Sequence, residues 1–186
     1  MQHLSVAEYL EADEASEGKL EYVGGIVVAM AGASIRHNLI VSNIARVLGN
    51  ALAGRPCYVL TQDQRVCVSA TQSYLYPDVV VVCDEVDLSD ERPRSLRNPS
   101  LIVEVLSAST QDRDQGAKLG HYRRIPSVTQ VLLVAVDEPR VTVVERLDEE
   151  SWKLHDVGPG AEIDVRELGI TIDLADVYAK VDDLPA

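Results

Sequence analysis

The first part of the chain shows the patterns of a helix followed by a β-hairpin. Ser5 and Glu8 have the spacing at which a cap hydroxyl and a glutamate satisfy each other's backbone donors, which predicts a helix to about Glu14. Within residues 20–30, two β-favouring runs flank the pair Gly24-Gly25. A two-residue glycine loop between such runs is typical of a hairpin.

Two longer helices are expected farther along the chain. Apolar residues at three- and four-residue intervals follow Ser34, a suitable N-cap, and predict a helix that ends near Gly54. A second helical pattern begins at Thr110 and continues to Arg124, where Pro126 stops it. Both helices are long enough to cover a sheet.

Uninterrupted apolar runs mark the expected centre of that sheet. Residues 79–83 and 101–106 are almost entirely apolar, which indicates strands buried on both faces. The polar stretch between them, 84–98, is expected to be a loop. Further strands are expected at 57–60, 65–68, 129–136, 141–146 and 152–156, and Asp173 is expected to cap a last helix through Val181. The order of elements predicts one mixed α/β domain over residues 1–186.

The charge balance restricts contact with nucleic acid. The chain has 186 residues with 30 acidic and 17 basic side chains, and its formal net charge is −13. Such a charge repels a polyanion from any surface that is not locally basic. DNA binding is therefore expected to be weak and limited to a local patch, although a solvated surface is the usual role of such side chains. The candidate arginines are Arg92, Arg94, Arg97, Arg113, Arg123 and Arg124.

The lengths of the apolar runs and the spacing of the cysteines indicate where in the cell the protein is expected. No apolar run approaches the roughly 20 residues of a membrane-spanning helix. The first dozen residues are acidic and lack the basic start of a secretory signal. Cys57, Cys67 and Cys83 form no CxxC pair and lie in strand-like segments. We therefore predict reduced, buried cysteines and a cytoplasmic protein without membrane contact.

The motifs of several large enzyme classes are absent from the sequence. It contains no G-x-S-x-G elbow, no G-x-x-x-x-G-K-[ST] loop, no G-x-G-x-x-G turn and no H-E-x-x-H pair. These absences weigh against serine hydrolases, P-loop hydrolases, Rossmann dehydrogenases and zincins.

Two carboxylates stand in or beside the central apolar strands. Glu104 interrupts the run 101–106, and a buried ionised carboxylate must be paired, protonated or bound to a cation. Asp78 begins the other run, so the two meet if these strands are neighbours. Such a pair suits Mg²⁺, which is usually held by one or two carboxylates. The alternatives are a strand-edge turn residue for Asp78 and an ion pair with a nearby base for Glu104.

Lys118 is a third candidate. Asp114, Lys118 and Tyr122 follow one another at four-residue intervals on the predicted helix, and His121 lies one turn from Lys118. Because this helix follows directly on the Glu104 strand, it can point the lysine back over the end of that strand. The alternative is a solvated Asp114–Lys118 pair on the helix surface.

The sequence resembles the Uma-two family of the PD-(D/E)xK restriction-endonuclease-like superfamily in the order and spacing of these residues. The segments that carry the resemblance, from about Ser5 to Tyr178, are 21–23, 30–34, 37–38, 76–82, 103–110, Asp114, Gly116, Lys118 and 121–126. The resemblance implies a mixed β-sheet core flanked by helices, with an N-terminal hairpin and extra antiparallel strands. It also implies that Asp78 and Glu104 bind Mg²⁺ or Mn²⁺, and that the lysine of the motif has moved to Lys118 on the helix.

The resemblance extends to a further acid and has departures. Glu21 would be the N-terminal acid of the site, with an ordinary hairpin surface residue as the alternative, and His37 either faces the cleft or has no role. The family's Asp-Gly-Glu hairpin turn is Gly24-Gly25-Ile26 here, an acid before the lysine is Ala117, and Leu106 stands where the parent motif has its lysine. The missing acids weigh against a second metal ion but not against the first.

Two functions remain open at this point. The first is a metal-dependent endonuclease in which Asp78 and Glu104 hold Mg²⁺ or Mn²⁺ and Lys118 orients the attacking water. The second is a catalytically inactive nuclease-fold dimer with a binding or regulatory role, which the acidic charge favours. A homodimer is expected in either case.

Overall fold

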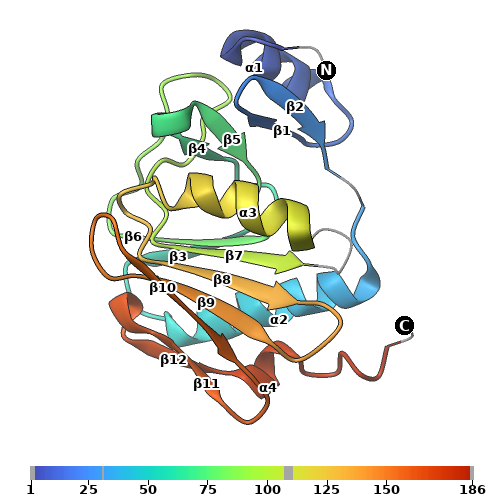
Figure 1. Ribbon diagram of the computed structural model, residues 1–186, viewed down its shortest axis with the longest axis vertical. Helices are drawn as coiled ribbons and strands as arrows, with labels where there is room; N and C mark the ends of the chain where they lie inside the picture. The colour runs from blue at the N-terminus through green and yellow to red at the C-terminus, as the bar shows by residue number, and fades with distance from the viewer. Residues whose placement is uncertain (1–2, 31, 107–110, 185–186) are drawn as a thin grey trace.

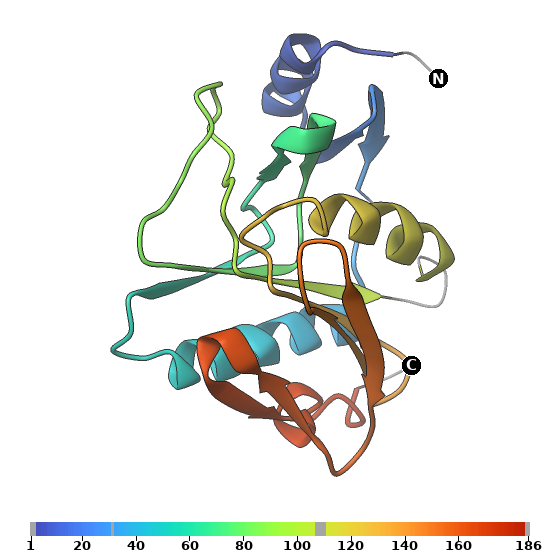
Figure 2. The same cartoon turned by 60° about the vertical axis from the view of Figure 1, so that its left-hand side comes forward.

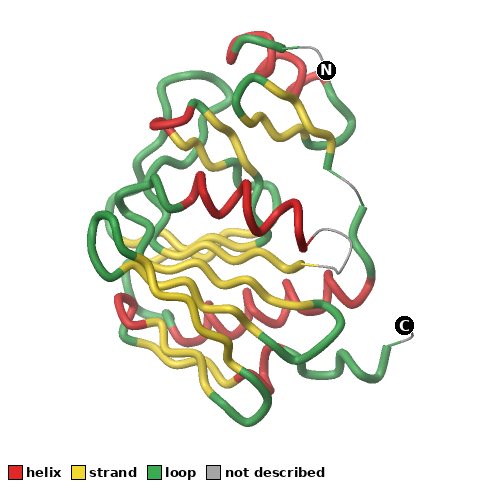
Figure 3. The backbone as a smooth tube through the Cα atoms, in the orientation of Figure 1, coloured by secondary structure: helices red, strands yellow, loops and turns green. Residues whose placement is uncertain are grey.

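The computed structural model describes residues 3–30, 32–106 and 111–184, with the side chains of 111–115 excepted. Figure 1 labels the helices and strands along the chain, and Figure 3 colours the backbone by helix, strand and loop. The helices are α1 (Val6–Ala15), α2 (Ile35–Ala51), α3 (Gln111–Tyr122) and α4 (Leu174–Val177), with the 3-10 turns η1 (Ser69–Thr71) and η2 (Arg166–Leu168). The strands are β1 (Leu20–Val23), β2 (Ile26–Ala29), β3 (Cys57–Thr61), β4 (Val66–Val68), β5 (Ser73–Leu75), β6 (Val79–Cys83), β7 (Leu101–Leu106), β8 (Gln130–Ala135), β9 (Val141–Arg146), β10 (Trp152–Val157), β11 (Glu162–Val165) and β12 (Ile170–Asp173).

A six-stranded mixed sheet with the order β10-β9-β8-β7-β6-β3 forms the centre of the fold. Its neighbours pair antiparallel except β7 and β8, which are parallel. Parallel neighbours need a crossover connection, and α3 lies on that connection. Figure 2 shows α3 on one side of the sheet and α2 on the other. The expected α/β class, with helices flanking a mixed sheet, is confirmed.

Side chains that alternate along β6 and β7 fill the apolar clusters on both faces of the large sheet. Val79, Val81 and Val103 pack in the same buried cluster as α2. Val80 and Ile102 pack in a second cluster that includes side chains of α3 and of the segment after it. Because neighbouring residues of a strand point to opposite faces, these continuous apolar runs supply both clusters.

A smaller sheet and α1 pack beside the large sheet. Its order is β2-β1-β5-β4, and the predicted hairpin forms its β1–β2 pair. Tyr9 of α1 stacks on Tyr22 of β1, with 4.9 Å between ring centroids, and Tyr74 of β5 lies 5.4 Å from Tyr9. The predicted capping box is present, because Ser5 and Glu8 bond each other's backbone at the start of α1. Through β1, the small sheet holds Glu21 against the backbone of Tyr76, in the segment that leads from β5 to β6 of the large sheet.

The C-terminal part differs from the expectation. Asp173 caps α4 as predicted, but the helix ends at Val177 rather than continuing to Val181. The pair β11–β12 and the short strand β5 were not predicted. Asn43 of α2 fastens this part to the core, since its side chain donates to the carbonyls of Val177 and Ala179.

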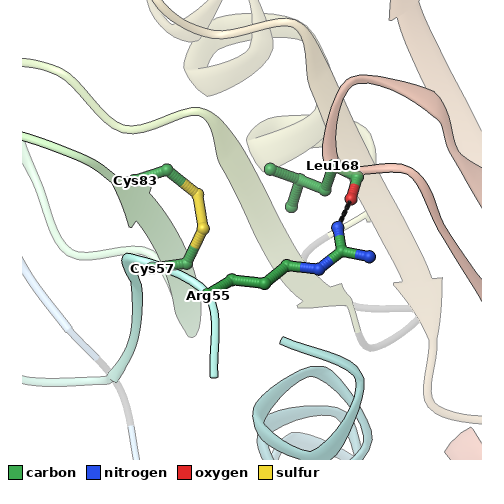
Figure 4. Close-up of a disulfide and its surroundings, with 4 residues drawn as sticks. All are labelled: Arg55, Cys57, Cys83 and Leu168. Carbon is green, nitrogen blue, oxygen red and sulfur yellow. Dashed lines mark hydrogen bonds between the residues drawn. A yellow bond between two sulfur atoms is a disulfide. The ribbon is translucent and has the colours of Figure 1, made fainter. Parts of the chain in front are cut away.

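Two of the three cysteines contradict the prediction of reduced thiols, and the third agrees with it. Cys57 and Cys83 lie opposite each other on β3 and β6 and form a disulfide, while Cys67 is a buried free thiol. Figure 4 shows the disulfide beside Arg55, whose guanidinium donates to the carbonyl of Leu168. None of the helices in the described ranges is long and apolar enough to cross a membrane. The disulfide removes the cysteine argument for a reducing compartment, so the cytoplasmic location stays a prediction.

Candidate active site

The β6–β7 pair places Asp78 and Glu104 close together. Val79 pairs with Val103 in an antiparallel register, so one residue farther along Asp78 lies opposite Glu104. The backbone N–H of Val105 donates to Asp78 Oδ2 at 2.7 Å. Asp78 is therefore fixed against β7 and is not a free turn residue at a strand edge.

Two side chains of α3 converge on Glu104. The Tyr122 hydroxyl donates to Glu104 Oε1 at 2.5 Å. The Lys118 Nζ lies 3.5 Å from the same oxygen. Lys118 and Tyr122 are four residues apart and so occupy one face of α3, which runs above β7 in Figure 1. Leu106, at the position of the motif lysine, packs in the apolar cluster of this face instead.

Glu21 joins the same group from the small sheet. Its Oε1 lies 2.9 Å from Lys118 Nζ and accepts the backbone N–H of Tyr76 at 3.0 Å. Glu21 is 6% exposed, which contradicts the alternative of an ordinary hairpin surface residue. The Lys118 side chain is 12% exposed and bridges Glu21 and Glu104, so it is not a solvated surface lysine.

The site holds more carboxyl groups than basic side chains. Glu21, Asp78 and Glu104 are all buried, and the basic side chains that contact them in the described part of the chain are Lys118 and His37. Burial raises the pKa of Glu104 to about 8; the Lys118 ammonium opposes this shift, and the charges of Asp78 and Glu21 add to it. An excess of carboxyl groups over basic side chains is a setting in which a cation would be held.

His37 comes to the site from the first turn of α2. Ser34 caps this helix by accepting the His37 backbone N–H. The ring Nε2 of His37 lies 3.3 Å from Asp78 Oδ1. Burial lowers the pKa of His37, but the hydrogen bond and charge of Asp78 outweigh it and the net shift is upward. The ring Nδ1 is buried and has no hydrogen-bond partner within the described ranges. Of the two expectations for His37, that it faces the site or that it has no role, the structure agrees with the first.

Sequence reasoning did not assign roles to Tyr122 and Tyr76. The four-residue spacing placed Tyr122 on the face of Lys118, and that spacing was the available signal for a shared partner. Tyr76 contacts Glu21 through its backbone, which no side-chain pattern reveals.

The candidate arginines are in different surroundings. Arg92, Arg94 and Arg124 are exposed. Arg97 forms an ion pair with Asp87 at 2.7 Å, and the Arg123 guanidinium lies 5.4 Å from the centre of the Trp152 ring. The side chain of Arg113 lies outside the described residues.

The donor set fits a hard cation held by few protein ligands. Within the described ranges, no group of three or more His, Cys, Asp or Glu side chains gathers closely enough to hold a metal by itself. A pair of carboxylates is nevertheless enough for Mg²⁺, which keeps several waters and typically takes one or two carboxylates. Asp78 and Glu104 are such a pair.

A family model and two similar sequences relate the chain to known proteins. A model of the Uma2 family, described as "Putative restriction endonuclease", matches residues 6–175. Two uncharacterised proteins of Synechocystis sp. (strain ATCC 27184 / PCC 6803 / Kazusa) are similar to the chain. The first, sll1609, is 35% identical over 162 residues, which cover 87% of this chain and 92% of the relative. The second, slr1290, is 30% identical over 175 residues, or 94% of this chain and 91% of the relative.

A solved structure shows the same fold at low sequence identity. It is the crystal structure of "a putative nuclease belonging to DUF820" from Anabaena variabilis ATCC 29413. The TM-score is 0.76 at 17% identity, and the match covers 96% of this chain and 99% of the other. The fold is thus a nuclease-like fold, and the chain belongs to the Uma2 family.

Proposed function

We propose that the protein is an endonuclease that uses Mg²⁺ or Mn²⁺ to hydrolyse DNA phosphodiester bonds. The observation that carries the proposal is the contact between Lys118 and two buried acids, Glu21 and Glu104, next to Asp78 on the paired strand. A group of acids with one lysine at the end of a β-sheet suits the hydrolysis of a phosphodiester. The family and the fold support the same reaction class.

Asp78 and Glu104 are the residues that would hold the cation. Both are buried, and their charges disfavour each other, because Asp78 raises the pKa of Glu104. A divalent cation relieves this repulsion and in return lowers the pKa of bound water and neutralises charge on the phosphate. The backbone N–H of Val105 keeps Asp78 turned toward β7.

Lys118 would supply positive charge to the reacting phosphate. Its ammonium is held by Glu21 at 2.9 Å and reaches Glu104 at 3.5 Å, so it is oriented before any substrate binds. A preorganised charge costs no rearrangement when negative charge develops in the transition state. Glu21 therefore acts as the residue that positions the lysine.

Exposed arginines would make the contact with DNA, although the protein as a whole is strongly acidic. Arg92, Arg94 and Arg124 are the exposed candidates, and Arg97 would have to exchange its partner Asp87 for a phosphate. Binding is therefore expected to be weak and local. A homodimer, which would present two such patches, remains part of the proposal.

The experiment that tests the proposal is Mn²⁺-dependent nicking of a supercoiled plasmid. Lys118→Ala should reduce the nicking rate by about 10² to 10³, the usual effect of removing one preorganised charge. Lys153→Ala removes an exposed lysine of β10 and is the matched control, with a wild-type rate expected. Equal rates for wild type and Lys118→Ala would remove Lys118 from the mechanism.

A catalytically inactive nuclease-fold dimer is the second candidate. The net charge of −13 and the pairing of Arg97 with Asp87 favour it, because both reduce the attraction for DNA. Absence of nicking by wild-type protein that binds Mn²⁺ would support this binding or regulatory role.

A further inference from the structure

The hydroxyl of Tyr122 and the ammonium of Lys118 contact the same oxygen of Glu104. Tyr122 donates to Oε1 at 2.5 Å, and Lys118 Nζ lies 3.5 Å from Oε1. Both contacts come from adjacent turns of α3. Neither of these two contacts involves Oε2 of Glu104.

Packing against apolar side chains holds the Tyr122 ring in place. The Tyr122 ring is fully buried and belongs to the same cluster as Ile102 and Leu106, which flank Glu104 on this face of β7. The hydroxyl donates to Glu104 Oε1, so the packed ring fixes the place of this carboxylate oxygen.

We infer that Tyr122 is a positioning residue, which holds Oε1 of Glu104 and so orients the carboxylate for a divalent cation. The inference rests on the proposed function, since it needs Glu104 to be a metal ligand. Hydrogen-bond partners behind a ligand commonly change metal affinity by 10- to 100-fold when removed. Tyr122 has no contact with the cation in this account and acts through Glu104.

The test is the affinity for Mn²⁺, measured by calorimetric titration of the full chain. Tyr122→Phe keeps the ring in its cluster and removes the hydroxyl, and we expect Mn²⁺ binding about tenfold weaker. Tyr9→Phe is the matched control. Tyr9 is also fully buried and donates one hydrogen bond, to the carbonyl of Leu20 at 2.8 Å, but it belongs to the cluster around α1. Its variant should bind Mn²⁺ like the wild type.

The same substitution in a Glu104 variant separates an effect on carboxylate orientation from a general loss of structure. Glu104→Asp keeps a carboxylate but withdraws it by one methylene, so the Tyr122 hydroxyl no longer reaches it in the same way. Adding Tyr122→Phe to Glu104→Asp should then change the affinity less than twofold. An unchanged affinity in Tyr122→Phe alone, or an equal loss in both backgrounds, would overturn the inference and leave the proposed function standing. Absence of Mn²⁺ binding by the wild type would overturn both.

Discussion

At the scale of single residues, Glu104 has the most unusual environment of the site. It is buried on β7 among apolar neighbours, with Asp78 opposite and Glu21 nearby. Lys118 and Tyr122 stabilise its ionised form but do not cancel the cost of burial. The divalent cation that we propose here would displace the proton of this carboxyl group.

This environment predicts a pH-dependent stability in the absence of divalent cations. The pKa of Glu104 rises from an ordinary 4.5 to about 8, so between these pH values the folded protein holds a proton that the unfolded chain has released. The free energy of unfolding must therefore fall as the pH rises through this window. The raised pKa of His37 acts in the same direction.

Urea unfolding with EDTA between pH 5 and pH 8 measures this effect. Glu104→Gln should flatten the dependence, by an amount on the order of a few kcal/mol across the window. Glu145→Gln, at another buried acid outside the site, is the control and should keep the wild-type slope. A wild-type slope in Glu104→Gln would show that another group carries the dependence.

At the scale of elements, a buried ion pair docks α1 against the rest of the protein. Arg65, next to β4, lies 2.7 Å from Asp13 of α1 and donates to Ser95. Asp13 also accepts the Tyr76 hydroxyl at 2.6 Å. Tyr76 in turn bonds Glu21 through its backbone, so the docking of α1 is linked to the position of a site residue.

Breaking this pair should destabilise the protein strongly. Arg65→Met leaves Asp13 as a buried charge without its ion-pair partner, and such a loss typically costs about 3–5 kcal/mol. Arg97→Met breaks an exposed pair with Asp87 and should cost far less, because solvent screens such a pair. The free energy of unfolding from urea titrations compares the two. Equal losses would mean that Asp13 finds another partner or becomes protonated.

Elements with a local signal were predictable, and those that depend on distant pairing were not. The capping box at Ser5, the Gly24-Gly25 turn and the apolar runs of β6 and β7 lie within a few residues of sequence. By contrast, β5 has three residues, too few for an alternating pattern, and its register with β1 is set by contacts across the fold.

The same distinction holds for the candidate site and the disulfide. Glu104 stood out because it interrupts an apolar strand, Asp78 because it directly precedes another, and Lys118 because its helix follows the Glu104 strand. The contact between Glu21 and Lys118 needs the small sheet in place, which no local pattern encodes. Cys57 and Cys83 are 26 residues apart and meet because β3 pairs with β6, a neighbour relation that the sequence does not display.

At the scale of the whole molecule, the acidic surface and the acidic site have opposite consequences for ligands. A net charge of −13 disfavours long-range attraction of DNA, so contact must come from the few exposed arginines. The acidic groups Glu21, Asp78 and Glu104, which gather around Lys118 and the β6–β7 pair, would favour a divalent cation there. A bound cation would reduce the local repulsion of a phosphate.

The most direct test of the account is a crystal structure of the protein grown with Mn²⁺. We predict an anomalous difference peak between the carboxylates of Asp78 and Glu104, with Lys118 still near Glu21. The peak should be absent from crystals of Asp78→Asn grown in the same way. A wild-type structure with Mn²⁺ bound elsewhere, or with none between Asp78 and Glu104, would contradict the account.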